Sequence, residues 1–247
     1  ANTLKQISGS LEAFWDRLAP LFVLVYQAAV LICLVAAAVL AYGWFQLPSL
    51  GVLAGPEMVV GNVQEARYDW EGQTVPLSIP QQVMLVAIDG QPITEAVDLQ
   101  AVLRRYQPGQ EVQLQLRARS GHLSTAAVTL ETTTAYERIL FFLLPFIVGL
   151  AFLASGAWSV WKRMDDSAAR TYALLSASLA FVLGGWFDLW STHRFVTFWL
   201  LLVGIAAGAL IHYTLIFPSS LPLKDRIPLL NWFGYVIGIG LAVYLIF

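Results

Sequence analysis

The stretch QVMLVAIDGQPI occupies residues 82–93 of a chain of 247 residues. Its central run, Val83 to Ile88, is short and continuously apolar, which is typical of a buried strand. Asp89-Gly90 follows at once, and this dipeptide favours a tight turn between two strands. The stretch therefore predicts a strand and a sharp turn within a water-soluble folded segment.

The residues after this turn predict a mixed α and β domain. A helix is expected next, with Thr94 as its N-cap, Pro108-Gly109 as its stop and an apolar face made of Leu99, Val102, Leu103 and Tyr106. Residues 112–119 then alternate between apolar and polar side chains, which is the period of a half-buried strand. Ser120-Gly121 turns the chain into a partner strand from Leu123 to Glu131. The predicted order is strand, turn, helix, strand, hairpin and strand.

This segment resembles the second half of a bacterial PDZ domain, in which an apolar strand precedes DG-x-P-Φ, DL-x-x-x-L and a strand pair. The matching residues are Val86 to Ile93, Asp98-Leu99 with Leu103, and Val112 to Leu130. Further upstream, Ser49-Leu50-Gly51-Val52 resembles the carboxylate-binding loop of that family. The Gly-Asp step usual before the buried strand is replaced here by Pro80-Gln81-Gln82.

PDZ domains bind extended peptides by adding a strand to a sheet edge. The resemblance therefore implies a peptide-binding groove, bordered by Leu50, Gly51, Val52, Leu99 and Leu103. A second interpretation is that Gly51 merely permits a tight exit from the preceding apolar segment near Pro48. The sequence leaves both interpretations open.

The rest of the chain has the composition of an integral membrane protein. Hydrophobic residues make up 58% of the chain and charged residues 12%, whereas a soluble domain has roughly half and a quarter. Apolar stretches long enough to cross a hydrocarbon core of about 30 Å predict spans at residues 20–45, 139–161, 171–190, 195–217 and 229–247. The expected fold class is a polytopic α-helical membrane bundle of at least five spans, with an α+β PDZ-like domain inserted after the first.

Four segments follow from this pattern: an interfacial helix at 1–19, a first span at 20–45, the PDZ-like domain at 46–135 and a span bundle at 136–247. The first segment carries apolar side chains at helical spacing opposite a polar face, which is typical of a helix lying in the membrane interface. Because the last apolar stretch reaches Phe247 without a polar tail, we expect the native polypeptide to continue beyond it.

Basic residues beside the spans predict the orientation, because short cytoplasmic loops are enriched in Lys and Arg. Most of them fall on one side of the predicted spans, namely Lys5, Arg17, Lys162, Arg163, Arg170, Lys224 and Arg226, whereas the opposite short loop from Ser191 to Arg194 has only Arg194. The N-terminus is therefore expected in the cytoplasm and the PDZ-like domain outside it, in a multi-pass protein of the bacterial cytoplasmic (inner) membrane.

A second resemblance lies at the end of the span 195–217. The sequence from His212 to Pro218, HYTLIFP, resembles the H-[FY]-x-L-x-F-P span end in multi-span sensor regions of bacterial signalling proteins, such as competence-type sensor histidine kinases. In that layout a kinase, cyclase or regulatory output follows the last span. The resemblance implies a sensory or docking module that binds a peptide or membrane-protein partner, with any enzymatic output beyond Phe247. The alternative is a non-catalytic accessory subunit of a larger membrane complex.

An intramembrane serine protease is a further alternative. Ser155 and His212 lie at similar depths in spans separated by one helix, as in the Ser-His dyad of rhomboid proteases. However, Leu153 stands where that family has glycine, and no His-x-x-x-Asn span supplies an oxyanion site. The sequence favours an interhelical hydrogen bond for His212 and a packing role for small residues, namely Ser155-Gly156, Gly204, Gly208, Gly234, Gly238 and Gly240.

Other ligand classes find little support in the sequence. No metal or cofactor is expected, because HExxH is missing and the histidines form no ligand cluster. The net charge of −2 indicates no nucleic-acid partner. Cys33 is expected to be a small core residue and Asp188 a solvated or Arg194-paired residue at the membrane surface. The expected partners are a peptide or membrane protein and the lipid bilayer, and a homodimer is left open.

Overall fold

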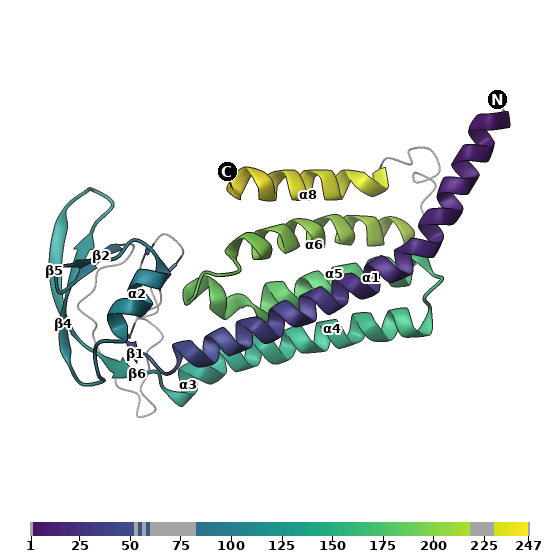
Figure 1. Cartoon of the computed structure of the whole chain (residues 1–247). Coiled ribbons are helices and arrows are strands. Elements are labelled where there is room, and N and C mark those ends of the chain that lie inside the picture. Colours follow the sequence, from purple (N-terminus) through teal and green to yellow (C-terminus); the bar gives the residue numbers. More distant parts are fainter. Residues whose placement is uncertain (1, 52–53, 56–57, 60–82, 218–229, 247) are drawn as a thin grey trace. The chain divides into compact units, whose positions relative to one another are not determined.

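The computed structural model describes residues 2–51, 54–55, 58–59, 83–217 and 230–246. Val52, Pro80-Gln81-Gln82, the predicted basic loop with Lys224 and Arg226, and the side chains of residues 1–17 lie outside this description. The chain forms two units (Figure 1). The first contains Ala1–Ala36, Leu144–Gly185 and Thr197–Phe247, and the second contains Ala37–Leu143 and Trp186–Val196.

Four helical stretches are long and apolar enough to cross a membrane, namely Leu18–Trp44, Ala135–Lys162, Ser167–Trp190 and Val196–Ile216. They coincide with the first four predicted spans. The first stretch is the C-terminal part of helix α1 (Asn2–Trp44), on which Leu34 is fully buried and Cys33, predicted to lie in the core, is only half-buried. Helix α8 (Leu230–Ile246) has 17 residues and is shorter than these four. The fifth span therefore stays a prediction.

Two of these stretches are composite. Ala135–Lys162 consists of helix α3 (Ala135–Arg138), the π-helical turn η2 (Ile139–Leu143) and helix α4 (Leu144–Lys162). Ser167–Trp190 consists of helix α5 (Ser167–Gly184) and the 3₁₀ turn η3 (Trp186–Trp190). Each stretch begins with a side-chain cap, because the Thr134 hydroxyl accepts the Glu137 N–H at 3.2 Å and Asp166 Oδ1 accepts the Ala168 N–H at 2.9 Å.

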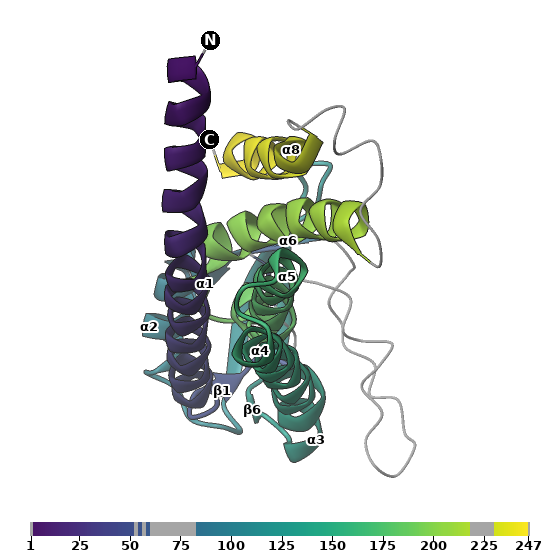
Figure 2. The same cartoon turned by 90° about the vertical axis from the view of Figure 1, so that its right-hand side faces the viewer.

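Helices α6 (Val196–Ile216) and α8 meet through two glycines on each helix, four residues apart; Figures 1 and 2 show α6 between α8 and α5. A Cβ atom built on Gly208 would lie 2.7 Å from Tyr235 Cα, and one built on Gly234 would lie 3.1 Å from Gly208 Cα. Gly204 and Gly238 approach each other still more closely. Since no side chain fits there, the predicted packing role of these four glycines is confirmed.

The other two glycines predicted to pack differ from each other. Gly156 in α4 is confirmed, because a Cβ there would overlap Ser176 Oγ of α5 and lie 3.0 Å from Gln27 Nε2. The prediction for Gly240 is wrong, since no atom of the described residues lies within 4 Å of its Cβ position. Successive helical residues are rotated by about 100°, and Gly240 comes two residues after Gly238. It therefore lies on nearly the opposite side of the helix.

The second unit contains the insert (residues 46–135), with a four-stranded antiparallel sheet. The strand order is β3-β2-β4-β5, with bounds Gln91–Pro92, Met84–Ile88, Glu111–Arg117 and Leu123–Thr129. Helix α2 (Ala96–Leu103) lies between β3 and β4 in the chain. Strand β4 buries Val112, Leu114 and Leu116 and exposes the residues between them, as the alternating pattern predicts. These side chains pack with Leu99, Val102 and Leu103 of α2 in one core.

The Asp89-Gly90 turn between β2 and β3 is formed as predicted, with φ values of 46° and 76°. The carboxylate of Asp89 accepts the Gln113 N–H at 2.8 Å and the Tyr106 hydroxyl at 2.7 Å. These hydrogen bonds, the one from Gln113 first, hold the pKa of Asp89 below its usual value. The turn is thereby joined to both β4 and the end of α2.

Helix α2 begins one residue later than predicted. Its N-cap is Glu95, and Thr94 instead donates its hydroxyl to Asp98 Oδ2 at 2.6 Å. Asp98 Oδ2 also accepts the N–H groups of Thr94 and Glu95 at 3.1 Å each. The Asp98 carboxylate, which belongs to the first turn of α2, therefore accepts hydrogen bonds from the N–H groups just before the helix.

A second, two-stranded sheet joins the two ends of the insert. Strand β1 (Pro48–Ser49) pairs antiparallel with β6 (Glu131–Thr132), so that Pro48 lies opposite Thr132. The predicted partner strand from Leu123 to Glu131 is thus divided, with β5 ending at Thr129 and β6 beginning at Glu131. This pair places the turn after β1 beside the segment that leads into α3.

Candidate functional site

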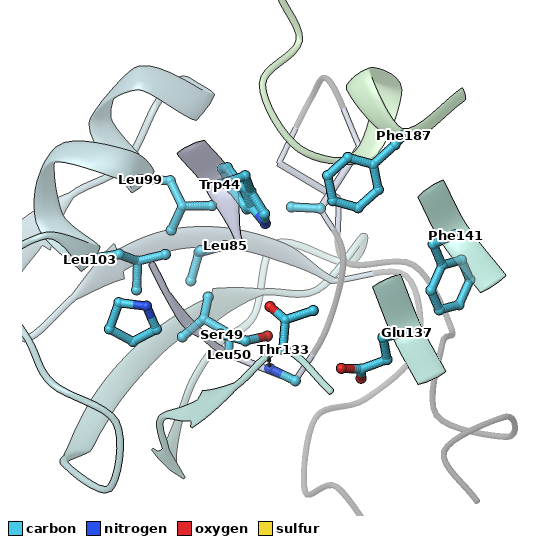
Figure 3. A pocket seen from close by; sticks show the side chains of 13 residues that line it. Trp44, Ser49, Leu50, Leu85, Leu99, Leu103, Thr133, Glu137, Phe141 and Phe187 are labelled. Atoms are coloured by element: carbon cyan, nitrogen blue, oxygen red, sulfur yellow. Dashed lines mark hydrogen bonds between the residues drawn. The ribbon is translucent and has the colours of Figure 1, made fainter. Parts of the chain in front are cut away.

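A pocket in the second unit brings together four of the five residues predicted to bind a peptide (Figure 3). Leu50 and Gly51 follow strand β1, Leu99 and Leu103 lie on helix α2, and all four line the pocket. The fifth residue, Val52, lies outside the described residues. We refer to this cavity as the Gly51 pocket.

The turn that forms one wall of the Gly51 pocket has a conformation that favours glycine. Gly51 has a φ of 73°, which is in the left-handed region. Its N–H donates to Ser49 Oγ at 3.1 Å, while the Leu50 side chain turns inward and is buried. Gly51 is therefore needed for the shape of this turn, whatever the pocket binds.

The opposite wall is aromatic and was not predicted. Trp44 from the end of α1, Phe141 from η2 and Phe187 from η3 line the pocket there. Phe187 also packs against Phe45, with ring centroids 4.9 Å apart. These side chains come from three segments far apart in the sequence, and no local pattern marks them as neighbours.

The described residues that line the Gly51 pocket give it a negative charge. Glu137 is the charged side chain among the lining residues, and its carboxylate accepts the Thr134 N–H at 2.8 Å and the Thr134 hydroxyl at 3.0 Å. A peptide carboxylate placed here would be repelled by Glu137, and the Gly51 N–H is already bonded to Ser49. The pocket therefore suits an apolar side chain within a segment better than a free C-terminus.

The Gly51 pocket is narrow. Its volume is about 40 Å³, whereas one water molecule needs about 10–15 Å³ and a site for a small molecule measures about 300 Å³ or more. In this conformation it has room for a few water molecules. A peptide side chain can enter only if one wall moves.

Residues between η3 and α6 support the wall that carries Phe187. Asp188 is buried, and its carboxylate accepts the Thr192 hydroxyl and the N–H groups of Arg194 at 3.2 Å and Phe195 at 2.8 Å. The prediction that Asp188 is solvated is therefore wrong, because these donors in the segment before α6 replace water around the carboxylate. Its contact with Arg194 is made through the main chain.

His193 connects the same segment to the pocket. Its Nε2 donates to the carbonyl oxygen of Ala54, which lines the pocket, at 3.0 Å. His193 itself has a φ of 54°. Burial lowers the pKa of the His193 imidazole, so the neutral form is favoured.

The structure does not pair Ser155 with His212. The Ser155 hydroxyl donates to the Phe152 carbonyl at 2.8 Å and lies 3.0 Å from the Tyr172 hydroxyl. His212 Nδ1 lies 3.4 Å from the hydroxyl of Tyr235 on α8, which is the interhelical contact that the sequence favours. Over residues 83–217, no hydrogen bond joins the two members of the suggested dyad. The described residues also contain no group of His, Cys, Asp or Glu side chains suited to a metal ion.

The Gly51 pocket and the helices long enough to cross a membrane are thus the features from which function can be inferred. The predicted groove residues come from separate elements, and the suggested catalytic residues do not meet. Comparison of the sequence with protein-family models and with curated proteins gives no match.

Proposed function

We propose that this chain is the sensory or docking module of a bacterial membrane signalling protein, and that the insert is a PDZ-like domain that binds a peptide or a segment of a partner protein. The observation that carries this proposal is the meeting of Leu50 and Gly51 with Leu99 and Leu103 at one pocket. PDZ domains bind an extended peptide by adding a strand to a sheet edge, and this loop and this helix face would border such a peptide.

The preferred ligand is an extended segment that inserts one apolar side chain. The walls of the Gly51 pocket are mostly aliphatic and aromatic, which favours such a side chain. Glu137 disfavours a terminal carboxylate and favours a basic residue next to the inserted one. We therefore expect an internal segment with an apolar residue beside Lys or Arg.

Binding changes the ends of the long helices in this proposal. Because the pocket has room for only a few water molecules, an entering side chain would have to displace the aromatic wall of Trp44, Phe141 and Phe187. Trp44 ends the stretch Leu18–Trp44, and Phe141 lies within the stretch Ala135–Lys162. Occupancy is thereby converted into movement at the ends of two spans, which an output on the other side of the membrane can sense.

Peptide selection on the full chain in lipid nanodiscs tests the proposal. A displayed library of random peptides is enriched on wild-type protein and on Leu99→Phe, which narrows the pocket further. Val97→Phe is the matched control, since Val97 lies on the same helix, is exposed and does not line the pocket. We expect enrichment on wild type and Val97→Phe and its loss on Leu99→Phe. Equal recovery from all three proteins would contradict the proposal and favour the accessory-subunit alternative.

The orientation belongs to the same proposal, with the N-terminus in the cytoplasm and the insert outside. It rests on the basic residues of the loop 162–170. In a Cys33→Ser background, a cysteine at Gln107 should react with an impermeant thiol reagent in intact cells, whereas one at Asp165 should be shielded. The reverse labelling would remove the extracytoplasmic sensing role.

A further inference from the structure

A second cavity lies entirely within the first unit, where the connection between α4 and α5 meets the end of α6. Its volume is about 490 Å³, which is within the range of small-molecule sites. Two basic side chains, Lys162 and Arg163, line it together with the aromatic side chains of Trp158, Tyr172, Tyr213 and Phe217. We refer to it as the basic cavity.

The basic side of this cavity carries more positive than negative charge. The Lys162 ammonium lies 4.8 Å from the ring centroid of Trp158 and 5.2 Å from that of Trp161. Among the lining residues that the structure describes, Asp166 is the acidic one, and its Oδ1 already accepts the Ala168 N–H at 2.9 Å at the start of α5. Two cations against one partly engaged carboxylate favour an anionic ligand.

The other side of the cavity is a continuous aromatic wall. The Tyr213 ring lies 5.8 Å from the Tyr172 ring and is stacked on Phe217 with centroids 5.1 Å apart. The Tyr172 hydroxyl is 3.0 Å from Ser155 Oγ, so its polar end is directed toward α4. Flat apolar faces are thus available beside the two cations.

This combination occurs at one end of helices that are long enough to cross a membrane, where lipid headgroups lie. Basic pockets between membrane helices bind phosphate-bearing headgroups. A free phosphate ester shares that chemistry, but it has no apolar chain to pack against an aromatic wall. We propose that the basic cavity binds a phospholipid, with its phosphate at Lys162 and Arg163 and its glycerol and first acyl carbons along Tyr213 and Phe217. This inference does not depend on what the Gly51 pocket binds.

Retention of lipid by the full chain in a non-ionic detergent tests the proposal. Native mass spectrometry is performed after incubation with phosphatidylglycerol for wild type, for Lys162→Gln with Arg163→Gln, and for Arg117→Gln with Arg119→Gln. The last pair removes the same charge from exposed positions of the insert. We expect roughly a tenfold loss of bound lipid in the first double variant and no loss in the second. Equal retention by all three proteins would overturn the proposal.

A competition experiment distinguishes a lipid from a water-soluble phosphate ester. Bound phosphatidylglycerol is challenged with glycerol 3-phosphate, and the Phe217→Ser variant is measured beside wild type. For a lipid site, glycerol 3-phosphate fails to displace the lipid and Phe217→Ser weakens retention. Displacement at millimolar concentration, with retention unaffected by Phe217→Ser, would overturn the lipid assignment and leave a soluble phosphate ester as the ligand.

Discussion

The sheet of the insert and the contact between α6 and α8 are packed in opposite ways. The sheet is filled by large side chains, and Leu114 and Leu116 are both fully buried against α2. The helix contact depends on the absence of side chains, because a Cβ atom on Gly204 or Gly208 would overlap backbone atoms of α8. Both regions are tightly packed, but by different residues.

The difference is the one expected if α6 and α8 lie in lipid, as their apolar sequences favour, while the insert folds in water. In water, removing an apolar side chain from the solvent stabilises the fold by about 25 cal/mol per Å², so a sheet gains by burying leucines. In lipid, apolar side chains gain little by leaving the solvent, and helices associate through close contact of their backbones. Glycine permits the closest contact, which explains why glycines recur four residues apart on both helices.

The largest expected effect comes from breaking the sheet. Leu116→Asp places a carboxylate at a fully buried position and should destabilise the insert by more than about 4 kcal/mol. The control Gln115→Asp, at an exposed position of the same strand, should cost less than about 0.5 kcal/mol. Limited proteolysis of the full chain should then show new cleavages in the insert and continued protection of α4 and α5. Cleavage of those helices as well would show that the two regions do not fold separately.

A smaller effect is expected at the helix contact, where the chain supplies its own control. Gly238→Val should separate α6 from α8 and cost about 2–3 kcal/mol, because the added side chain meets the backbone of Gly204. Gly240→Val makes the same change in the same helix, at a position where no described atom lies within 4 Å of the Cβ site. Its cost should be close to zero in denaturant titrations of the full chain in mixed micelles. If both variants lost equal stability, helix propensity and not close packing would be the cause.

The smallest effect concerns the turn beside the sheet and depends on pH. Because the native pKa of Asp89 is lowered, its contribution to stability is present above the ordinary aspartate pKa of 3.8 and is lost as the pH falls through the native value. Asp89→Asn should therefore lower stability near pH 7 by roughly 0.5–1 kcal/mol, a modest amount because solvent screens this exposed carboxylate. Thermal unfolding at pH 7 and at a series of pH values below 3.8 measures the difference, which should shrink as the pH falls through the lowered native pKa. A difference that did not change with pH would mean that the charge of Asp89 has no part in holding the turn.

Periodicity predicted the elements that are long or strongly alternating. The burial of Val112, Leu114 and Leu116 and the four long helical stretches follow directly from the spacing of apolar residues. The pairing of β1 with β6 could not be predicted in this way. Each of these strands has two residues, and more than eighty residues separate them, so no local pattern joins them.

The candidate site was predictable on one side only. Leu50, Gly51, Leu99 and Leu103 belong to short motifs that can be recognised in sequence, and the structure gathers them at one pocket. The aromatic wall depends on how the ends of three helical segments meet, which sequence spacing does not encode. Asp188 was misjudged for a similar reason, because an acidic residue near a surface tryptophan gives no sign that nearby N–H groups will surround it.

The β1–β6 pair brings the two ends of the insert together, so that the insert is attached to the rest of the chain at one place. Pro48 stands opposite Thr132, so the chain enters and leaves the insert at neighbouring points, four residues after α1 ends and three residues before α3 begins. A domain attached in this way can be exchanged for another of different size without changing the spacing of the helices that hold it. It also acts as a handle with two attachment points, since a force applied to the insert reaches α1 and α3 together.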